Sequence, residues 1–282
     1  MNDQAKRLRE LVDTNKKNQK VIAVSSGKGG VGKTSIVANM AVALSNINKK
    51  VILFDGDLGL ANVDIVLGIK TKYSIIDVIN KSKTLEEIIV DYNTNLKIIP
   101  AGSGIEDISN VAENDLIELL EKLNELSNQT DVLLIDTGAG ISKKVMTLLK
   151  NAIDIIIVAT PEPTSMADAY ATIKILTLNY NRKDIKMFVN MTKDKSEAQS
   201  VFNNMNNICE KFLNTKLEMA SYSIFDKNLP NSIKSQKPLI LDYPDSSFSI
   251  SIKRLINYFF SQNIKIIDNP IKKFFNNLFR RL

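Results

Sequence analysis

The sequence predicts an α/β fold: a doubly wound, mainly parallel β-sheet flanked by helices. Short runs rich in β-branched and aliphatic residues alternate with longer segments of helical period, which is the pattern of such a sheet. The 282 residues, 44% hydrophobic and 24% charged, can bury one sizeable core, which excludes disordered and fibrous classes. The expected strands are VIAVSS at 21, VILFD at 51, LKIIP at 96, DVLLID at 131, DIIIVAT at 154 and IKMFVN at 185. The expected helices between them cover residues 34–44, 115–126, 166–178 and 197–212.

Three segments follow from this pattern. Residues 1–20 form a short helix (about 2–12) and a polar stalk, 21–266 form the α/β domain, and 267–282 form a C-terminal helix after the turn-forming DNP. The chain lacks a run of about 18 apolar residues and an apolar signal segment at its start. We therefore expect a cytoplasmic protein.

Charge and composition exclude several functions. The net charge of +6 lies at the ends, because residues 1–20 and 270–282 carry +7 together. Residues 21–269 hold 27 basic and 28 acidic groups, so the body offers no net-charge argument for coating DNA. With no histidine and only Cys209, the chain lacks the usual residues of zinc, haem and Ser-His-Asp sites.

A phosphate-binding loop follows the first strand. The segment GKGGVGKT, residues 27–34, fits G-x-x-x-x-G-K-[ST] at every fixed position, with a strand before it and a helix after it. Its backbone N–H groups and the helix N-terminus would hold phosphates, Lys33 would reach the β and γ oxygens, and Thr34 would ligate Mg²⁺.

A second lysine in the loop, Lys28, makes it resemble the deviant phosphate loop of the SIMIBI ATPases, which include MinD, ParA and the nitrogenase iron protein. The resemblance implies an ATP-bound homodimer in which Lys28 crosses to the partner's nucleotide. It also implies a nucleotide site made of Gly27, Lys28, Gly29, Gly30, Val31, Gly32, Lys33, Thr34 and Ser35.

Two carboxylate segments fall where such a site needs them. DGDLGLANVD, residues 55–64, resembles the switch I segment of MinD-type ATPases, in which Asp57 matches the aspartate that orients the attacking water. Asp55 is expected to be its structural or magnesium-shell neighbour. The strand 131–136 delivers Asp136 to the same sheet edge, where it would hold Mg²⁺ through water, and the following TGAG turn would sense the γ-phosphate.

Base recognition is predicted from two further positions. In this group an asparagine at the end of a later strand contacts adenine, and Asn190 matches it, although Met191 stands where an arginine often follows. Pro161 and Glu162 match a turn that lines the base pocket in MinD relatives. ATP is preferred over GTP because no guanine-reading N-K-x-D signature is evident.

The C-terminal segment has the pattern of an amphipathic helix that lies on an anionic membrane. Pro270 opens it, and its cations are Lys272, Lys273, Arg280 and Arg281, without an acid. Docking on the protein's own core is the alternative. The apolar stripe consists of Ile271, Phe274, Phe275, Leu278, Phe279 and Leu282.

The N-terminal DQAKRLRE contains the pattern D-Q-A-x-x-L-R at Asp3, Gln4, Ala5, Leu8 and Arg9. It resembles the FlhG family (also called YlxH or FleN), MinD-like ATPases that control flagellar number and placement. The resemblance implies that this helix binds FlhF, a GTPase of the signal-recognition-particle type, and stimulates its hydrolysis. Gln4 would then help to order water, and Leu8 and Arg9 would anchor the helix.

The resemblance thus implies an ATP- and Mg²⁺-dependent ATPase of the FlhG type that cycles on and off the inner membrane. Flagellar switch or C-ring proteins and a transcription activator are further candidate partners, and no direct nucleic-acid partner is expected. Three alternatives stay open: a MinD-type division regulator, a ParA-type DNA-segregation ATPase, and a nucleotide-gated scaffold with little turnover. An iron-protein role would need two cysteines per subunit, and the chain has one.

Overall fold

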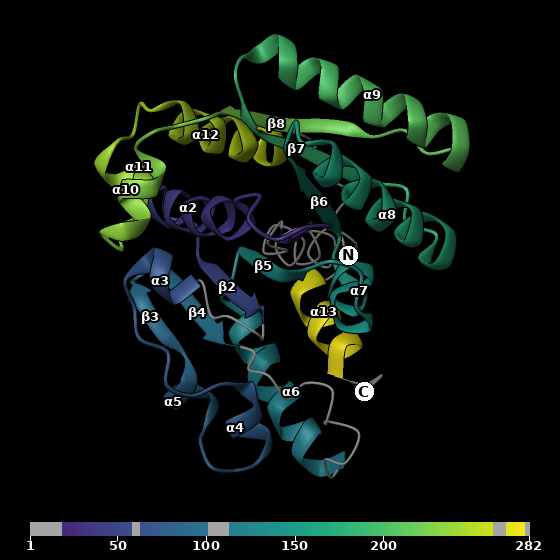
Figure 1. Cartoon of the computed structure of the whole chain (residues 1–282). Helices are drawn as coiled ribbons and strands as arrows, with labels where there is room; N and C mark the ends of the chain where they lie inside the picture. Colours follow the sequence, from purple (N-terminus) through teal and green to yellow (C-terminus); the bar gives the residue numbers. More distant parts are fainter. Residues whose placement is uncertain (1–18, 58–62, 101–112, 262–268, 280–282) are drawn as a thin grey trace, which may run out of the picture.

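The computed structural model describes residues 19–57, 63–100, 113–261 and 269–279. Its centre is an eight-stranded sheet in the order β3-β4-β2-β5-β1-β6-β7-β8, in which only the edge pair β3–β4 is antiparallel (Figure 1). The strands are β1 (Lys20–Ser26), β2 (Val51–Gly56), β3 (Val90–Asn93), β4 (Leu96–Pro100), β5 (Val132–Ala139), β6 (Asp154–Ala159), β7 (Ile185–Thr192) and β8 (Glu218–Ile224).

All six predicted strands are confirmed, and two edge strands, β3 and β8, were not predicted from the sequence. β3 is four residues long and only half-buried, and β8 includes a glutamate and two serines. An edge strand is partnered on one side only and so needs no continuous apolar run. Apolar patterning therefore found the six inner strands and missed both edges.

Helices cover both faces of the sheet, as predicted for a doubly wound fold (Figure 1). The four predicted helices are confirmed, each longer by a few residues. One face carries α4 (Ile75–Ile79), α5 (Leu85–Ile88), α6 (Glu113–Asn128), α7 (Lys143–Asn151), α8 (Pro163–Tyr180), α9 (Lys195–Leu213) and α13 (Pro270–Phe279). The other carries α2 (Lys33–Asn46), α3 (Val63–Leu67), α10 (Leu229–Lys234), α11 (Leu239–Asp242) and α12 (Ser247–Phe260).

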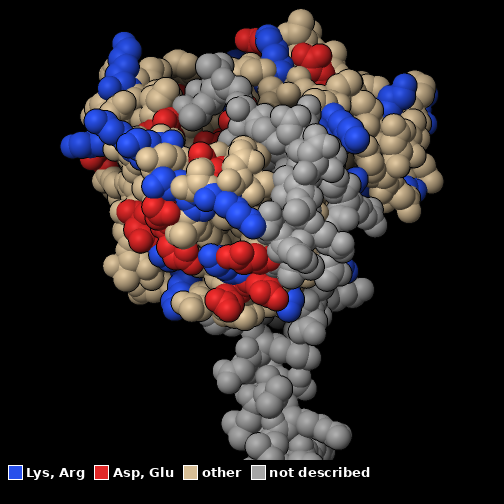
Figure 2. Space-filling view, turned by 90° about the horizontal axis from the view of Figure 1, so that it is seen from below, with Lys and Arg blue, Asp and Glu red and all other residues tan. Residues whose placement is uncertain are grey.

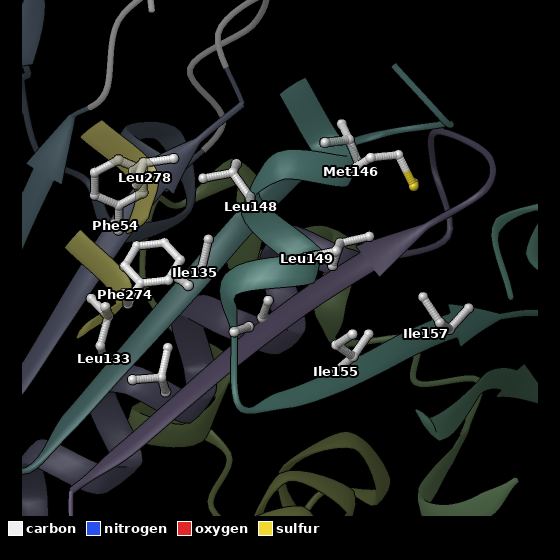
Figure 3. Close-up of a cluster of buried hydrophobic side chains, with 14 of the residues drawn as sticks. Phe54, Leu133, Ile135, Met146, Leu148, Leu149, Ile155, Ile157, Phe274 and Leu278 are labelled. Atoms are coloured by element: carbon white, nitrogen blue, oxygen red, sulfur yellow. The ribbon is translucent and has the colours of Figure 1, made fainter. Parts of the chain in front are cut away.

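The C-terminal helix α13 is part of the core. It lies against α6, α7 and β1, and its apolar stripe faces the sheet (Figures 1 and 3). Phe274 and Phe275 each meet the Phe54 ring edge-on, with ring centroids 6.4 and 6.2 Å away. The five described stripe residues are at most 1% exposed: Ile271, Phe274, Phe275, Leu278 and Phe279.

In this conformation the sheet, and not a membrane, covers the stripe, which is the alternative that the sequence leaves open. The physical reason is the large apolar area that the sheet offers: burying one such side chain contributes about 1.5–3 kcal/mol, so the helix gains on the order of 10 kcal/mol by docking. The predicted cations Lys272 and Lys273 do remain exposed on the outer side. Arg280, Arg281 and Leu282 lie outside the described residues.

The surface of the described part is mixed in charge. Figure 2 shows Lys and Arg side chains interleaved with Asp and Glu on the face seen from below. This agrees with the near-neutral composition of residues 21–269. Within the described ranges, the helices are all too short or too polar to cross a membrane.

Candidate nucleotide-binding site

The phosphate loop connects β1 to α2 in a conformation that requires glycine. Gly32 is the residue before α2 and has a φ of 86°, a left-handed value that favours glycine. A Cβ there would also lie 2.5 Å from the Asn190 amide nitrogen, and a Cβ on Gly27 would lie 2.2 Å from the Asp168 backbone. The loop is therefore fitted tightly between β7 and α8, and its residues 29–34 line a cavity.

Lys33, the first residue of α2, is buried among carboxylates. Its Nζ lies 2.8 Å from Asp136 Oδ1 and 4.0 Å from Asp57 Oδ2. The structure thus brings together three of the predicted catalytic residues. The ammonium group compensates the buried charge here and lies where it can also meet phosphate oxygens.

Asp136 has the properties of a magnesium-shell ligand. Its side chain is fully buried at the end of β5, and its Oδ2 has no hydrogen-bond partner among the described residues. Burial raises its pKa, and Lys33 and the Thr34 hydroxyl oppose that effect. A buried acceptor without a partner is costly, and a hydrated cation beside Thr34 would satisfy it. The residues present therefore fit Mg²⁺, with Thr34 as direct ligand and Asp136 acting through water.

Asp55 sits opposite Asp136 on the neighbouring strand β2. Burial, and then the charge of Asp136, raise the pKa of Asp55 from 3.8 to about 7. Its Oδ1 accepts a hydrogen bond of 3.2 Å from the Asp57 N–H. Asp55 therefore also shapes the turn that carries Asp57.

This raised pKa predicts a pH-dependent stability of the metal-free, nucleotide-free protein. Because the folded state holds a proton that the unfolded state has lost, stability should fall as pH rises from about 4 to about 7, by up to roughly 4 kcal/mol. The Asp55→Asn variant should show a smaller loss, although not none, because burial raises the pKa of Asp136 as well. The difference in the free energy of unfolding between this variant and the parent protein, measured in urea, should therefore be more in favour of the variant at pH 8 than at pH 5. The chain has no histidine to titrate in this range. An advantage that does not change with pH would contradict the prediction.

Asp57 lies at the open side of the site and is 24% exposed. It lines the same cavity as the phosphate loop, and its Oδ1 is close to Gly138 in the predicted γ-phosphate-sensing turn. A carboxylate that faces both the cavity and this turn is placed to hold a water molecule against the terminal phosphate.

Lys28 does not line the cavity of its own chain. Its Nζ lies 3.0 Å from Glu162 Oε2 and 3.2 Å from Thr164 Oγ1 near the start of α8, and its side chain is 43% exposed. Neither Pro161 nor Glu162 lines the cavity of this chain, so their predicted role in the base pocket stays a prediction. The turn after β6 instead holds Lys28 at the molecular surface, where a second subunit could receive it.

The cavity of about 390 Å³ extends from the phosphate loop toward an apolar end. Asn190 lines the cavity, and its Nδ2 donates to the Val31 carbonyl at 2.8 Å, so it braces the loop; its contact with the base stays a prediction. Met191 adopts a left-handed φ of 58° beside it. The remaining wall includes residues that the sequence analysis missed, among them Ile224, Phe225, Asp226, Leu229, Pro230 and Ile233.

These missed residues follow β8, the edge strand that the apolar pattern did not reveal. The segment IFDKNLP would have been recognised as a strand-end loop only if that strand had been found. Their apolar side chains form a wall that suits the flat face of a base.

Cys209, the single cysteine, belongs to the core. It is 0% exposed on α9, and burial raises its pKa to about 11. A protonated, enclosed thiol does not offer a metal-cluster ligand.

Comparisons with known proteins agree with this site. The family model for ParA, described as the NUBPL iron-transfer P-loop NTPase, matches residues 17–259. The antiactivator FleN of Pseudomonas aeruginosa is 33% identical over 83% of both chains. The flagellum site-determining protein YlxH of Helicobacter pylori is 31% identical over the full length of both. The MinD cell division protein of Aquifex aeolicus superposes with a TM-score of 0.68 at 25% identity, covering 88% of this chain and 99% of that one. The chain therefore belongs to the ParA/MinD family of P-loop NTPases, in the group that contains FleN and YlxH.

Proposed function

We propose that this protein is an ATPase of the FlhG type: a regulator of flagellar number and placement that dimerises with ATP and cycles between the cytoplasm and the inner membrane. The observation that supports this proposal most directly is the phosphate site, where Lys33 contacts Asp136, in a chain that aligns with YlxH over its full length. The reaction is hydrolysis of ATP to ADP and phosphate. Mg²⁺ would supply charge neutralisation at the β and γ oxygens, held by Thr34 and, through water, by Asp136.

We assign separate roles in nucleotide binding and hydrolysis to the residues of the site. The loop N–H groups and Lys33 bind the phosphates, and Asp57 orients the attacking water. Asn190 and the apolar wall after β8 hold the base. Lys28 completes the site of the second subunit, because in its own chain it faces outward beside Glu162.

Membrane cycling would couple to the same site through α7. This helix follows the sensing turn Gly138–Gly140 and packs against α13. Leu148 of α7 also lies so close to Gly56 that a Cβ on that glycine would be 2.7 Å from its Cδ1. α13 lies in an apolar groove formed by α6, α7 and the sheet, called here the α13 groove. A shift of the turn on ATP binding would thus change the shape of this groove, and we propose that it releases α13 to anionic lipid. Two released helices on one dimer would bind more tightly than one.

The Lys28→Ala variant separates nucleotide binding from dimerisation. It should bind fluorescent ATP with nearly unchanged affinity, because the exposed Lys28–Glu162 pair contributes little to the monomer. It should stay monomeric with ATP in light-scattering chromatography and show basal hydrolysis reduced at least 10-fold. The matched Glu162→Ala variant frees Lys28 and should still dimerise. A Lys28→Ala dimer would refute the role in trans.

The flagellar assignment is tested with a peptide of residues 1–20, which contains the motif residues Asp3, Gln4, Ala5, Leu8 and Arg9; all five lie outside the described residues. The peptide should stimulate GTP hydrolysis by the cognate FlhF, and the peptide carrying Gln4→Ala should stimulate it much less. If neither the peptide nor the full chain stimulates FlhF, MinD-type division control becomes the better assignment, which the structural likeness to MinD already favours as second candidate.

A further inference from the structure

The groove beneath α13 cannot stay empty. Figure 3 shows Phe274 and Leu278 of α13 facing Phe54, Leu133 and Ile135, which are 0% exposed on the central strands. If α13 moves into lipid, the bilayer covers the helix but not the groove. An open apolar groove over the centre of a sheet is strongly unfavourable in water. A second apolar segment is therefore needed whenever α13 leaves.

Gln19, the first described residue, and Asn269, the residue before α13, both attach to the C-terminal end of α6. Gln19 Nε2 donates to the carbonyls of Ser127 and Thr130, at 2.7 and 2.9 Å. Asn269 Nδ2 donates to Asn128 Oδ1 at 2.9 Å, and Asn269 Oδ1 caps α13 by accepting from the Lys272 N–H at 3.0 Å. The N-terminal segment therefore joins the body at the end of the groove where α13 begins.

The sequence of this N-terminal segment suits the groove. Its predicted helix, about residues 2–12, would be roughly 16 Å long, and α13 with its ten residues about 15 Å. Six polar residues, 13–18, separate the helix from Gln19 and allow the chain to turn back. The stripe consists of Ala5, Leu8, Leu11 and Val12. The cations Lys6, Arg7 and Arg9 of this segment outnumber its acids Asp3 and Glu10, and α6 exposes the acids Glu118, Glu121 and Glu125.

We infer that the N-terminal helix of this chain occupies the α13 groove when α13 is released. The inference rests on the proposed membrane cycle and names the segment that fills the α13 groove during that cycle. Leu8, Leu11 and Val12 are smaller than the phenylalanines they would replace, so α13 regains the groove when no membrane competes for it. The two ends of the chain would thus alternate: with α13 docked the N-terminal helix is free for a partner, and with α13 in lipid it is covered.

The chain has no tryptophan, so Leu11→Trp in the full-length protein gives a single fluorescent reporter. In the protein without lipid, the emission of this reporter should be that of an exposed indole, and acrylamide should quench it readily. A variant that also carries Phe274→Asp and Phe275→Asp cannot dock α13. In that variant, without lipid, emission should shift to shorter wavelength and acrylamide quenching should fall at least 3-fold. Adding Val12→Asp should restore the exposed signal.

A second arm uses vesicles of phosphatidylglycerol and phosphatidylethanolamine with ATP. Leu11→Trp protein that sediments with the vesicles should show the same protection, without quenching by brominated lipid, because the groove and not the bilayer covers the introduced indole. Sedimenting protein whose indole stays exposed, or is quenched by brominated lipid, would overturn the inference and leave the membrane cycle intact. Protection that vanishes on dilution would also overturn it, since a second copy would then fill the groove. If the protein does not sediment with the vesicles, the proposed membrane binding fails. The variant with Phe274→Asp and Phe275→Asp then decides by itself whether the N-terminal segment can occupy the α13 groove.

Discussion

Replacing Asp57 with alanine should lower ATP hydrolysis roughly 100-fold while nucleotide binding persists. Asp57 faces the cavity at 24% exposure, and its Oδ2 is 4.0 Å from Lys33 Nζ, so it can hold a water molecule without contributing to phosphate binding. The ATP-bound dimer should therefore accumulate, and with vesicles it should stay on the membrane. Phosphate release and vesicle sedimentation measure the two effects.

Asp91→Ala provides the matched control, because it removes an exposed carboxylate from the edge strand β3, away from the site. That variant should hydrolyse ATP at the parental rate. If Asp57→Ala also hydrolyses at the parental rate, the assignment of residues 55–64 as the water-orienting segment is wrong.

Truncating Phe274 to alanine should destabilise the nucleotide-free protein by about 3–5 kcal/mol. The ring is 1% exposed and packs against Phe54 and Phe275, so its removal leaves a cavity in the central core. Urea unfolding followed by circular dichroism measures the change in the free energy of unfolding.

Lys272 lies on the exposed side of the same helix, and Lys272→Ala should change stability by less than about 0.5 kcal/mol. Comparing the two variants separates a docked helix from a free tail. Equal and small effects of both would mean that α13 is not part of the folded core in solution.

The phosphate site could be predicted from the sequence because its determinants are local. Residues 27–34 carry the glycines, the lysine and the hydroxyl in one continuous segment between a strand and a helix. Asp136 could be added because a parallel strand delivers its carboxyl end to the same edge of the sheet, and Asp57 because residues 55–64 resemble switch I of MinD-type ATPases. In the structure, Lys33 Nζ lies 2.8 Å from Asp136 and 4.0 Å from Asp57.

The apolar end of the cavity could not be predicted in the same way. Its wall follows β8, an edge strand that pairs with β7, packs against α12 and carries no continuous apolar run. The resemblance places Pro161 and Glu162 in the base pocket; in this structure Glu162 contacts Lys28.

The fold class, the phosphate chemistry and the amphipathic character of the C-terminal helix could be predicted because each is encoded by residues that are close together along the chain. What covers the apolar stripe of α13 depends instead on contacts between segments that are far apart in the sequence. An amphipathic helix is equally consistent with lipid and with a protein groove, since both remove the same side chains from water. The choice depends on whether the sheet offers an open apolar face of matching size, and here Phe54, Leu133 and Ile135 provide it.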